Sequence, residues 1–190
     1  MVRNIDSGKA SVLVLLDLSA AFDTVDHNTL LQVLDRRFGV TGTALNWFAS
    51  YLSGRSQTFK VAAQRSGPHP LECSVPQGSV LGPQEFTVYT EELECLIDRH
   101  SLGHHLYADD TQLIDGVRPV DICSSIGRLQ QCIEEIHRWC AFRRLQLNPS
   151  KTEVIWFGTA ATLKEIKDCD LALRVGRDVI KPVDVVRDLG

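Results

Sequence analysis

The 190-residue sequence lacks the features that would direct a protein to a membrane or out of the cell. No apolar run approaches the roughly 20 residues that a membrane-spanning helix requires. The run from Val12 to Leu16 is too short, and no charged segment with a cleavage site accompanies it. The six cysteines include no pair two or three residues apart, so the sequence shows no zinc clip. We therefore expect reduced thiols, an intracellular protein and no contact with a membrane.

The sequence also lacks an excess of positive charge. Its 20 Lys and Arg and 24 Asp and Glu give a net charge of −4, which counts against a free-standing, strong nucleic-acid binder. The charge does not exclude a catalytic core whose basic contacts lie elsewhere in a longer protein. Internal repeats and low-complexity linkers are absent too, so residues 1–190 are expected to form one domain.

Two adjacent carboxylates, Asp109 and Asp110, stand between two apolar runs. The pattern of residues 104–114 predicts two short strands joined by a tight acidic turn. Adjacent acids repel each other, which raises the pKa of one carboxyl unless a cation lies nearby. Because carboxylate oxygens suit Mg²⁺ or Mn²⁺, the pair is a candidate metal site. For an isolated Asp-Asp pair, a solvated acidic turn is the more common explanation.

A third acid, Asp17, lies near the end of an apolar, β-branched run that starts at Ser11 and suits a buried strand. An acid in this position needs a hydrogen-bond partner or a metal ion. The residues leave both interpretations open, since Asp17 can also cap the turn that contains Ser19 and Asp23. If the strands of Asp17 and Asp109 are neighbours in one sheet, three acids can hold two divalent ions about 4 Å apart for phosphoryl transfer.

The rest of the chain predicts further helices and strands. Helices are expected at residues 26–39, 43–54 and 126–140, and strands at 57–62 and 152–157. Asp26 and Thr43 are the expected N-caps of the first two helices.

The segment from Pro76 to Pro83 contains two glycines, a serine and two prolines, which predicts a shaped loop before a helix. Gly78 permits close approach of a ligand to the backbone, and the side chain of Gln77 offers both donors and an acceptor. The helix after Pro83 is expected to use Phe86, Tyr89, Leu93 and Leu96. An ordinary helix-entry loop explains the same residues.

Four segments, in order, resemble motifs of the reverse transcriptases of non-LTR, LINE-type retrotransposons. They are Val14–His27, similar to the first catalytic motif; Pro76–Pro83, similar to the template- and nucleotide-contacting loop; Tyr107–Asp110, similar to the catalytic hairpin; and Leu145–Thr152, similar to the lysine motif. Residues 47–55 are also similar to this family. Four motifs in the right order are far more specific than any one of them, and the resemblance covers residues 11–190.

The resemblance implies an α/β (α+β) fold of the palm polymerase type. We expect an antiparallel sheet that holds residues 12–17 beside the hairpin 106–113, with helices packed on one face. Residues 1–190 would be a single reverse-transcriptase domain, mainly palm with part of the fingers. The amino-terminal fingers and the thumb are missing, so the chain is expected to be truncated at both ends.

The resemblance also implies an activity, RNA-directed DNA polymerisation by two-metal nucleotidyl transfer. Its partners would be an RNA template, a DNA primer and deoxynucleoside triphosphates, in the nucleus if the chain acts as retrotransposon enzymes do. The implied catalytic residues are Asp17, Asp109, Asp110 and Lys151. The three acids and the Leu18 carbonyl would bind two Mg²⁺ ions, which Mn²⁺ can replace, and Lys151 would protonate or neutralise the leaving pyrophosphate.

The implied substrate contacts are Phe22, Gln77, Gly78 and Tyr107. Phe22 would be a steric gate that leaves no room for the 2′-hydroxyl of a ribonucleotide. Spacing alone favours Phe22 as a core aromatic, and Lys151 alone would be a solvated lysine.

Two other interpretations stay open at this point. Gln84-Glu85 stand where the family usually has apolar residues, and Arg143 stands where Asn is common. Such departures and the missing flanks also fit a truncated, catalytically inactive, element-derived protein. Another palm-fold enzyme, such as a nucleotide cyclase, would share the acidic hairpin but not the Pro76–Pro83 loop or the lysine motif. The sequence predicts neither the template RNA nor the oligomeric state.

Overall fold

The computed structural model describes residues 2–185, and residues 1 and 186–190 lie outside this range. The chain forms two compact units. The first, here called the sheet unit, comprises the residues up to Ser19, Glu92–Phe142 and the residues from Gln146 onward. The second, the helical unit, comprises Ala20–Glu91 and Arg143–Leu145. The expectation that residues 1–190 form a single domain stays a prediction.

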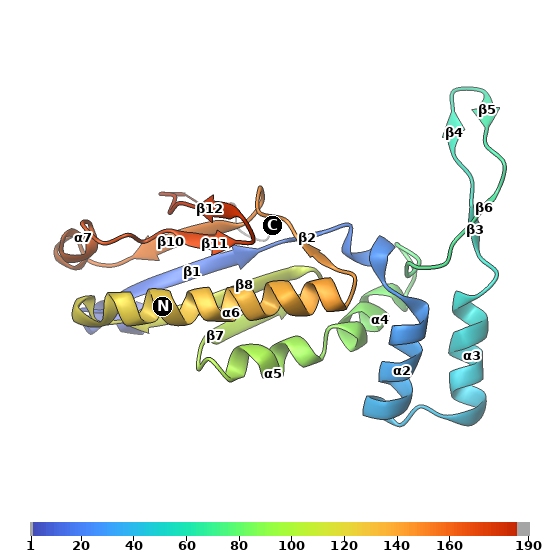
Figure 1. Ribbon diagram of the computed structural model, residues 1–190, viewed down its shortest axis with the longest axis horizontal. Helices are drawn as coiled ribbons and strands as arrows, with labels where there is room; N and C mark the ends of the chain where they lie inside the picture. The colour runs from blue at the N-terminus through green and yellow to red at the C-terminus, as the bar shows by residue number, and fades with distance from the viewer. Residues whose placement is uncertain (1, 186–190) are drawn as a thin grey trace. The chain divides into compact units, whose positions relative to one another are not determined.

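A four-stranded antiparallel sheet, with the strand order β10-β1-β8-β7, forms the core of the sheet unit (Figure 1). Its strands are β1 (Ala10–Leu16), β7 (Gly103–Tyr107), β8 (Asp110–Val117) and β10 (Glu153–Phe157). Strand β1 is central, and six of its seven residues are buried, as its apolar run predicts. Because β1 pairs directly with β8 of the acidic hairpin, the predicted neighbourhood of these segments is confirmed.

Helices α5 (Glu92–Asp98) and α6 (Ile122–Phe142) cover one face of this sheet (Figure 1). The alternation along β8 separates the two faces, because every second residue from Thr111 to Val117 is buried. On the buried face, the carboxylate of Asp115 accepts hydrogen bonds from Ser125 and Arg128 of α6. The palm-type α/β fold, with an antiparallel sheet and helices on one face, is therefore confirmed.

Smaller elements complete the sheet unit. They are α1 (Val2–Asp6), the paired strands β2 (Leu18–Ser19) and β9 (Gln146–Leu147), the short 3₁₀ helix η2 (Pro119–Asp121), α7 (Ala160–Ile166), and the hairpin of β11 (Leu173–Val175) and β12 (Asp178–Ile180). Helix α6 and strand β10 confirm the helix and strand predicted at 126–140 and 152–157. Within residues 2–185, no helix is both long enough and apolar enough to cross a bilayer.

The helical unit contains three α-helices, one 3₁₀ helix and an exposed ribbon. These are η1 (Ala21–Thr24), α2 (His27–Phe38), α3 (Gly42–Leu52), α4 (Gly82–Tyr89), and the paired strands β3 (Ser56–Gln57) with β6 (His69–Pro70) and β4 (Lys60–Val61) with β5 (Gln64–Arg65). Helix α2 packs on both α3 and α4. As predicted, Asp26 caps α2 by accepting a hydrogen bond from the Thr29 N–H at 2.8 Å, and Gly39, with φ 66°, ends it.

Three local predictions were wrong. Helix α3 begins at Gly42 after Thr41, so Thr43 lies inside the helix and does not cap it. Residues 57–62 form parts of two very short strands in place of one continuous strand. The helix after Pro83 stops at Tyr89, where the Thr90 hydroxyl donates to the Phe86 carbonyl, and Leu93 and Leu96 belong to α5 of the sheet unit.

Candidate active site

Asp17 and Asp110 come from neighbouring strands at one end of the sheet. Asp17 directly follows β1, and Asp110 is the first residue of β8. Because Leu16 pairs with Thr111, the same register places Asp17 opposite Asp110. Both acids line a cavity of about 400 Å³, together with Leu15, Leu16, Thr111, Gln112, Ser150, Lys151 and Glu153. The structure thus brings together two of the predicted acids and the predicted lysine.

The third predicted acid lies in a very tight turn. Tyr107 pairs with Asp110, so the turn between β7 and β8 contains only Ala108 and Asp109. Ala108 has φ 52°, in the left-handed region that residues with a side chain rarely adopt. Backbone conformations of this kind persist where the surrounding structure holds them, and they cluster at functional sites. Asp109 is not among the residues that line the cavity, although its charge acts on Asp110.

The electrostatics of the cavity favour a bound cation. Burial raises the pKa of Asp110, and the negative charges of Asp109 and Asp17 raise it further, while Lys151 opposes them. The Oδ2 atom of Asp17 is buried and accepts no hydrogen bond from the described residues. Its nearest cation is Nζ of Lys151, at 3.4 Å. The positive charge of Lys151, whose side chain is two-thirds exposed, is therefore set against the negative charges of Asp17, Asp109 and Asp110.

The turn at Asn148 holds Lys151 beside Asp17. The backbone N–H of Asn148 donates to the Asp17 carbonyl at 2.9 Å, which ties the turn to the end of β1. The Asn148 carbonyl accepts from the Lys151 N–H, and its side-chain Oδ1 accepts from the hydroxyl of Ser150 at 2.7 Å. Asparagine suits this position because its side chain closes a turn on the following residues. The lysine motif is thus anchored locally and to the acid that it faces.

The Leu18 carbonyl, a predicted metal ligand, accepts no hydrogen bond in the ladder between β2 and β9. Leu18 pairs with Leu147, and the bond from Asn148 to Asp17 makes this pair the non-hydrogen-bonded type. Backbone groups of such a pair point away from each other, so the ladder of β2 and β9 leaves the Leu18 carbonyl unused.

The oxygen atoms at this end of the sheet are suitable ligands for a divalent cation, but they do not form a complete coordination site. Among the described residues, no group of three or more His, Cys, Asp or Glu side chains is close enough to hold a metal ion. The buried Oδ2 of Asp17, which accepts no hydrogen bond from the described residues, and the raised pKa of Asp110 both mark places where a cation would lower the energy. Carboxylate and carbonyl oxygens are the ligands that Mg²⁺ and Mn²⁺ prefer.

The sequence analysis assigned no role in the site to several polar residues of the cavity, among them Gln112, Ser150 and Glu153. Leu15 pairs with Gln112 on one side and with Glu153 on the other. Because directly paired residues share a face, both polar side chains lie on the face that carries Asp17. The alternation within each strand was visible in the sequence, but the register that joins the strands was not.

Phe22 and the Pro76–Pro83 loop lie in the helical unit, where Phe22 contacts residues on both sides of the loop. The ring of Phe22 stacks on Phe86 with centroids 5.0 Å apart, and its carbonyl accepts a hydrogen bond from the Val75 N–H. Gln77 and Gly78 are exposed at the tip of the loop, and Gly78 has φ 82°. Tyr107, the fourth predicted substrate contact, belongs to the sheet unit and is 67% exposed.

Gly82 determines the shape of this loop, a role that the sequence analysis did not assign. A Cβ atom at Gly82 would lie 2.9 Å from the Pro76 carbonyl oxygen, which only a glycine avoids. The Gly82 N–H donates to the hydroxyl of Ser79 at 2.9 Å. Pro83 follows in the first turn of α4, as predicted.

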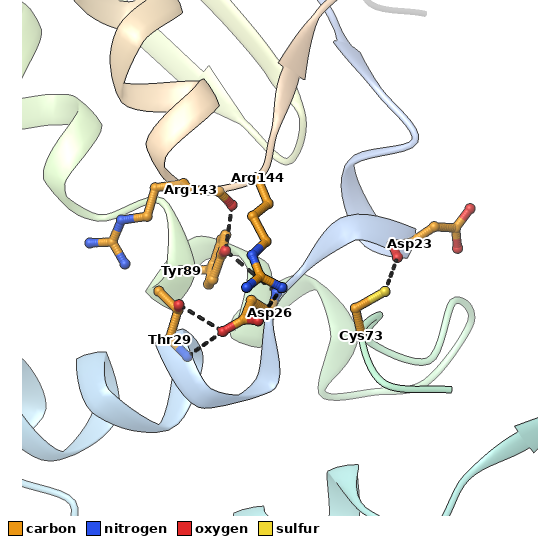
Figure 2. A network of polar contacts seen from close by, with 7 residues as sticks. All are labelled: Asp23, Asp26, Thr29, Cys73, Tyr89, Arg143 and Arg144. Carbon is orange, nitrogen blue, oxygen red and sulfur yellow. Dashed lines mark hydrogen bonds and ion pairs between the residues drawn. The ribbon is translucent and has the colours of Figure 1, made fainter. Parts of the chain in front are cut away.

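A polar network fixes the helical unit around Asp26 and Tyr89 (Figure 2). The Tyr89 hydroxyl donates to the Arg143 carbonyl at 2.5 Å, and the Asp26 N–H donates to the Tyr89 oxygen at 3.4 Å. The Asp26 carboxylate lies 2.8 Å from the Arg144 guanidinium. Burial acts to raise the pKa of Asp26, but the hydrogen bonds from Thr29 and the charge of Arg144 hold it below its ordinary value. The short segment after α6 is thereby attached to the helical unit.

Comparison with known proteins identifies a family over most of the chain. Residues 2–169 match the family model described as reverse transcriptase (RNA-dependent DNA polymerase). A "probable RNA-directed DNA polymerase from transposon BS" of Drosophila melanogaster is 32% identical over an alignment of 145 residues that covers 73% of this chain and 16% of that protein.

Two further relatives come from other mobile elements. The "RNA-directed DNA polymerase from mobile element jockey" of Drosophila melanogaster is 27% identical over 77% of this chain and 16% of its own length. The "retrovirus-related Pol polyprotein from type-1 retrotransposable element R2" of Popillia japonica is 26% identical over 82% of this chain and 25% of its own length. The chain thus spans only 16–25% of the length of these relatives.

Proposed function

Because the chain belongs to the reverse transcriptase (RNA-dependent DNA polymerase) family, we propose that it is the palm core of an RNA-directed DNA polymerase of a non-LTR retrotransposon. The observation that carries the proposal is the cavity that Asp17, Asp110 and Lys151 line together. Its substrates are deoxynucleoside triphosphates, an RNA template and a DNA primer. Priming on chromosomal DNA would put the activity in the nucleus.

In this proposal, Asp17, Asp109, Asp110 and the Leu18 carbonyl hold two Mg²⁺ ions, which Mn²⁺ can replace. The ions supply neutralisation of the phosphate charge and activation of the primer hydroxyl. The buried Oδ2 of Asp17, which accepts no hydrogen bond from the described residues, and the Leu18 carbonyl, which the ladder of β2 and β9 does not use, support this ligand set.

Lys151 is the proposed acid for the leaving group. The 3′-hydroxyl of the primer loses its proton to solvent and its oxygen attacks the α-phosphorus, while the bond to the bridging oxygen breaks, so pyrophosphate leaves with an extra negative charge. The Lys151 ammonium donates a proton to that oxygen or neutralises it. Its ion pair with Asp17 and the Asn148 turn support a fixed position for the ammonium.

The proposed substrate contacts are Tyr107 on the hairpin, and Phe22, Gln77 and Gly78 in the helical unit. The half-buried ring of Phe22 rests on Phe86, so a rigid flat surface is available to the nucleotide sugar. Such a surface leaves no room for a 2′-hydroxyl, which favours deoxyribonucleotides. Phe22→Ala should lower this discrimination in primer extension.

The test is primer extension on an RNA template, with two proteins. One is the 190-residue chain itself, for which we expect little extension, because a net charge of −4 offers few basic contacts to a duplex. The other is a chimera in which the aligned part of this chain replaces the matching segment of the transposon BS relative.

The chimera should extend the primer in Mg²⁺, and Asp109→Asn/Asp110→Asn in the chimera should abolish extension. A folded chimera that shows no extension would instead support the second candidate, a catalytically inactive element-derived chain.

A further inference from the structure

One segment of the helical unit has a net positive charge because it contains no acidic residue. From Arg36 to Leu71 the sequence contains five Lys or Arg residues and no Asp or Glu. At the average of 24 acids in 190 residues, a segment of this length would carry about four or five. Although the whole chain has a net charge of −4, the segment from Arg36 to Leu71 therefore has a net positive charge.

Most of this charge lies on an exposed ribbon, which we call the basic arm and define as residues 55–70. The arm extends from the end of α3 (Figure 1). Between residues 56 and 70 every residue is exposed except the half-buried Ser66, so the arm has no core of its own. Two two-residue ladders and the hydrogen bonds of Ser66 with Phe59 hold it together. An isolated two-stranded ribbon of this kind is only marginally stable in water.

Two cations face each other across this ribbon. Lys60 of β4 pairs directly with Arg65 of β5. Neither side chain forms an ion pair with any residue that the structure describes. Like charges directly opposite each other on a sheet destabilise the pairing. An anion bound between the two side chains would remove this cost and stabilise the ribbon.

Exposed aromatic rings accompany these cations. Phe59 is 57% exposed, and its ring lies 6.4 Å from the ring of His69 on the opposite side of the arm. At the foot of the arm, Trp47 stacks on Tyr51 with centroids 5.4 Å apart, and the Arg55 guanidinium lies 4.5 Å above the Tyr51 ring. Trp47 is 53% exposed, so its outer surface is open to a further stacking partner.

We propose that the basic arm, with Trp47 at its foot, is a binding site for single-stranded RNA. Phosphate lies between Lys60 and Arg65, and unpaired bases stack on Phe59 and Trp47. Basic grooves with interspersed aromatic rings bind single strands in this way, because phosphates supply the charge and every base has a flat surface. The identity of the polyanion as RNA rests on the proposed polymerase function, whereas the site rests on the charges and rings of the arm.

The decisive variant is Arg65→Glu, tested in the 190-residue chain. It converts the repulsive pair with Lys60 into an attractive one, so its melting temperature should be equal to or above that of the parent. Its affinity for a labelled 20-nucleotide oligouridylate, measured by fluorescence anisotropy, should fall about five- to tenfold at 100 mM salt. The slope of log affinity against log salt should become shallower by about 0.7 for each phosphate that the variant no longer neutralises.

Two further variants separate the contributions. Lys181→Glu makes the same change of net charge at an exposed site in the sheet unit, and it should leave both affinity and slope close to those of the parent. Phe59→Ala should weaken binding without changing the slope, because stacking releases no counterions.

Several outcomes would overturn the proposal. Unchanged RNA affinity in Arg65→Glu would do so, and so would an equal loss in Lys181→Glu, which would show only the effect of overall charge. The assay measures binding of RNA and needs no catalysis. The RNA-binding result is therefore interpretable even if the protein does not extend a primer, and each proposal can be refuted independently of the other.

Discussion

Asp110→Asn should stabilise the protein when no divalent cation is present. Burial and the charges of Asp109 and Asp17 raise the pKa of Asp110, so its ionised form is less favourable in the native state than in the unfolded chain. The amide keeps the shape of the side chain and removes the charge. Because the site is partly exposed, solvent screens the repulsion, and the gain should be a few tenths to about 1 kcal/mol. For a chain of this size that corresponds to an increase in melting temperature of about 1–4 °C.

The same substitution should reduce or abolish stabilisation by a divalent cation. At a Mn²⁺ concentration of about ten times Kd, binding to the native state alone contributes about 1.4 kcal/mol, or about 3–6 °C. The parent should show this increase, and Asp110→Asn should show much less. The melting temperatures of the two proteins should therefore cross as Mn²⁺ is added.

Thermal unfolding followed by circular dichroism, over a series of MnCl₂ concentrations, measures this crossing. Asp168→Asn, which removes one charge from an exposed position of the sheet unit, is the matched control and should respond to Mn²⁺ as the parent does. Two results would refute the conclusion that Asp110 is repelled by Asp109 and Asp17 and binds a cation with them. One is an Asp110→Asn protein that is less stable than the parent without Mn²⁺, and the other is an increase in its melting temperature with Mn²⁺ as large as that of the parent.

Three other substitutions test the surrounding structure. Lys151→Met removes the ammonium that lies 3.4 Å from Asp17, so the Mn²⁺ concentration that gives half of the stabilisation should fall. An unchanged concentration would contradict the idea that this lysine competes with the cation for Asp17. Tyr89→Phe removes the hydroxyl that donates to the Arg143 carbonyl, and denaturant unfolding should show a loss of about 1–3 kcal/mol; no loss would mean that water replaces the bond. Because the pKa of Asp26 is held below its ordinary value of 3.8, its contribution to stability is present above about pH 4 and is lost as the pH falls through the lowered pKa. Asp26→Asn should therefore flatten the acid limb of the stability profile, and a parallel acid limb would exclude this contribution.

The sequence predicted best those features that depend on neighbouring residues. The buried strand before Asp17, the hairpin at Asp109 and the cap at Asp26 each follow from a short local pattern, and all three are present. The prediction that the strand before Asp17 lies beside the Asp109 hairpin rested on the fact that acids from both could together bind metal ions. The comparisons with known proteins confirm the family that these motifs indicated.

Features that depend on long-range pairing were not predicted. The position of Glu153 in the cavity requires β10 to lie beside β1, and nothing within residues 152–157 specifies that neighbour. The end of α4 at Tyr89 was also missed, because the apolar spacing of Phe86, Tyr89, Leu93 and Leu96 would allow one continuous helix. Glu85 is buried in α4, where burial raises its pKa, although its sequence position suggested only a departure from the family pattern.

The central place of β1 in its sheet has a consequence for synthesis of the chain on the ribosome. Ala10 pairs with Val117, and Ser11 pairs with Phe157, so both partners of this strand are made long after it. At about 5–20 residues per second, roughly 5–20 s pass before β8 is complete, and β10 follows later. During this interval an apolar strand has two unpaired edges, which is the state most prone to aggregation. Fragments that end before β8 should therefore accumulate as insoluble material, and a useful carboxy-terminal truncation must retain β10.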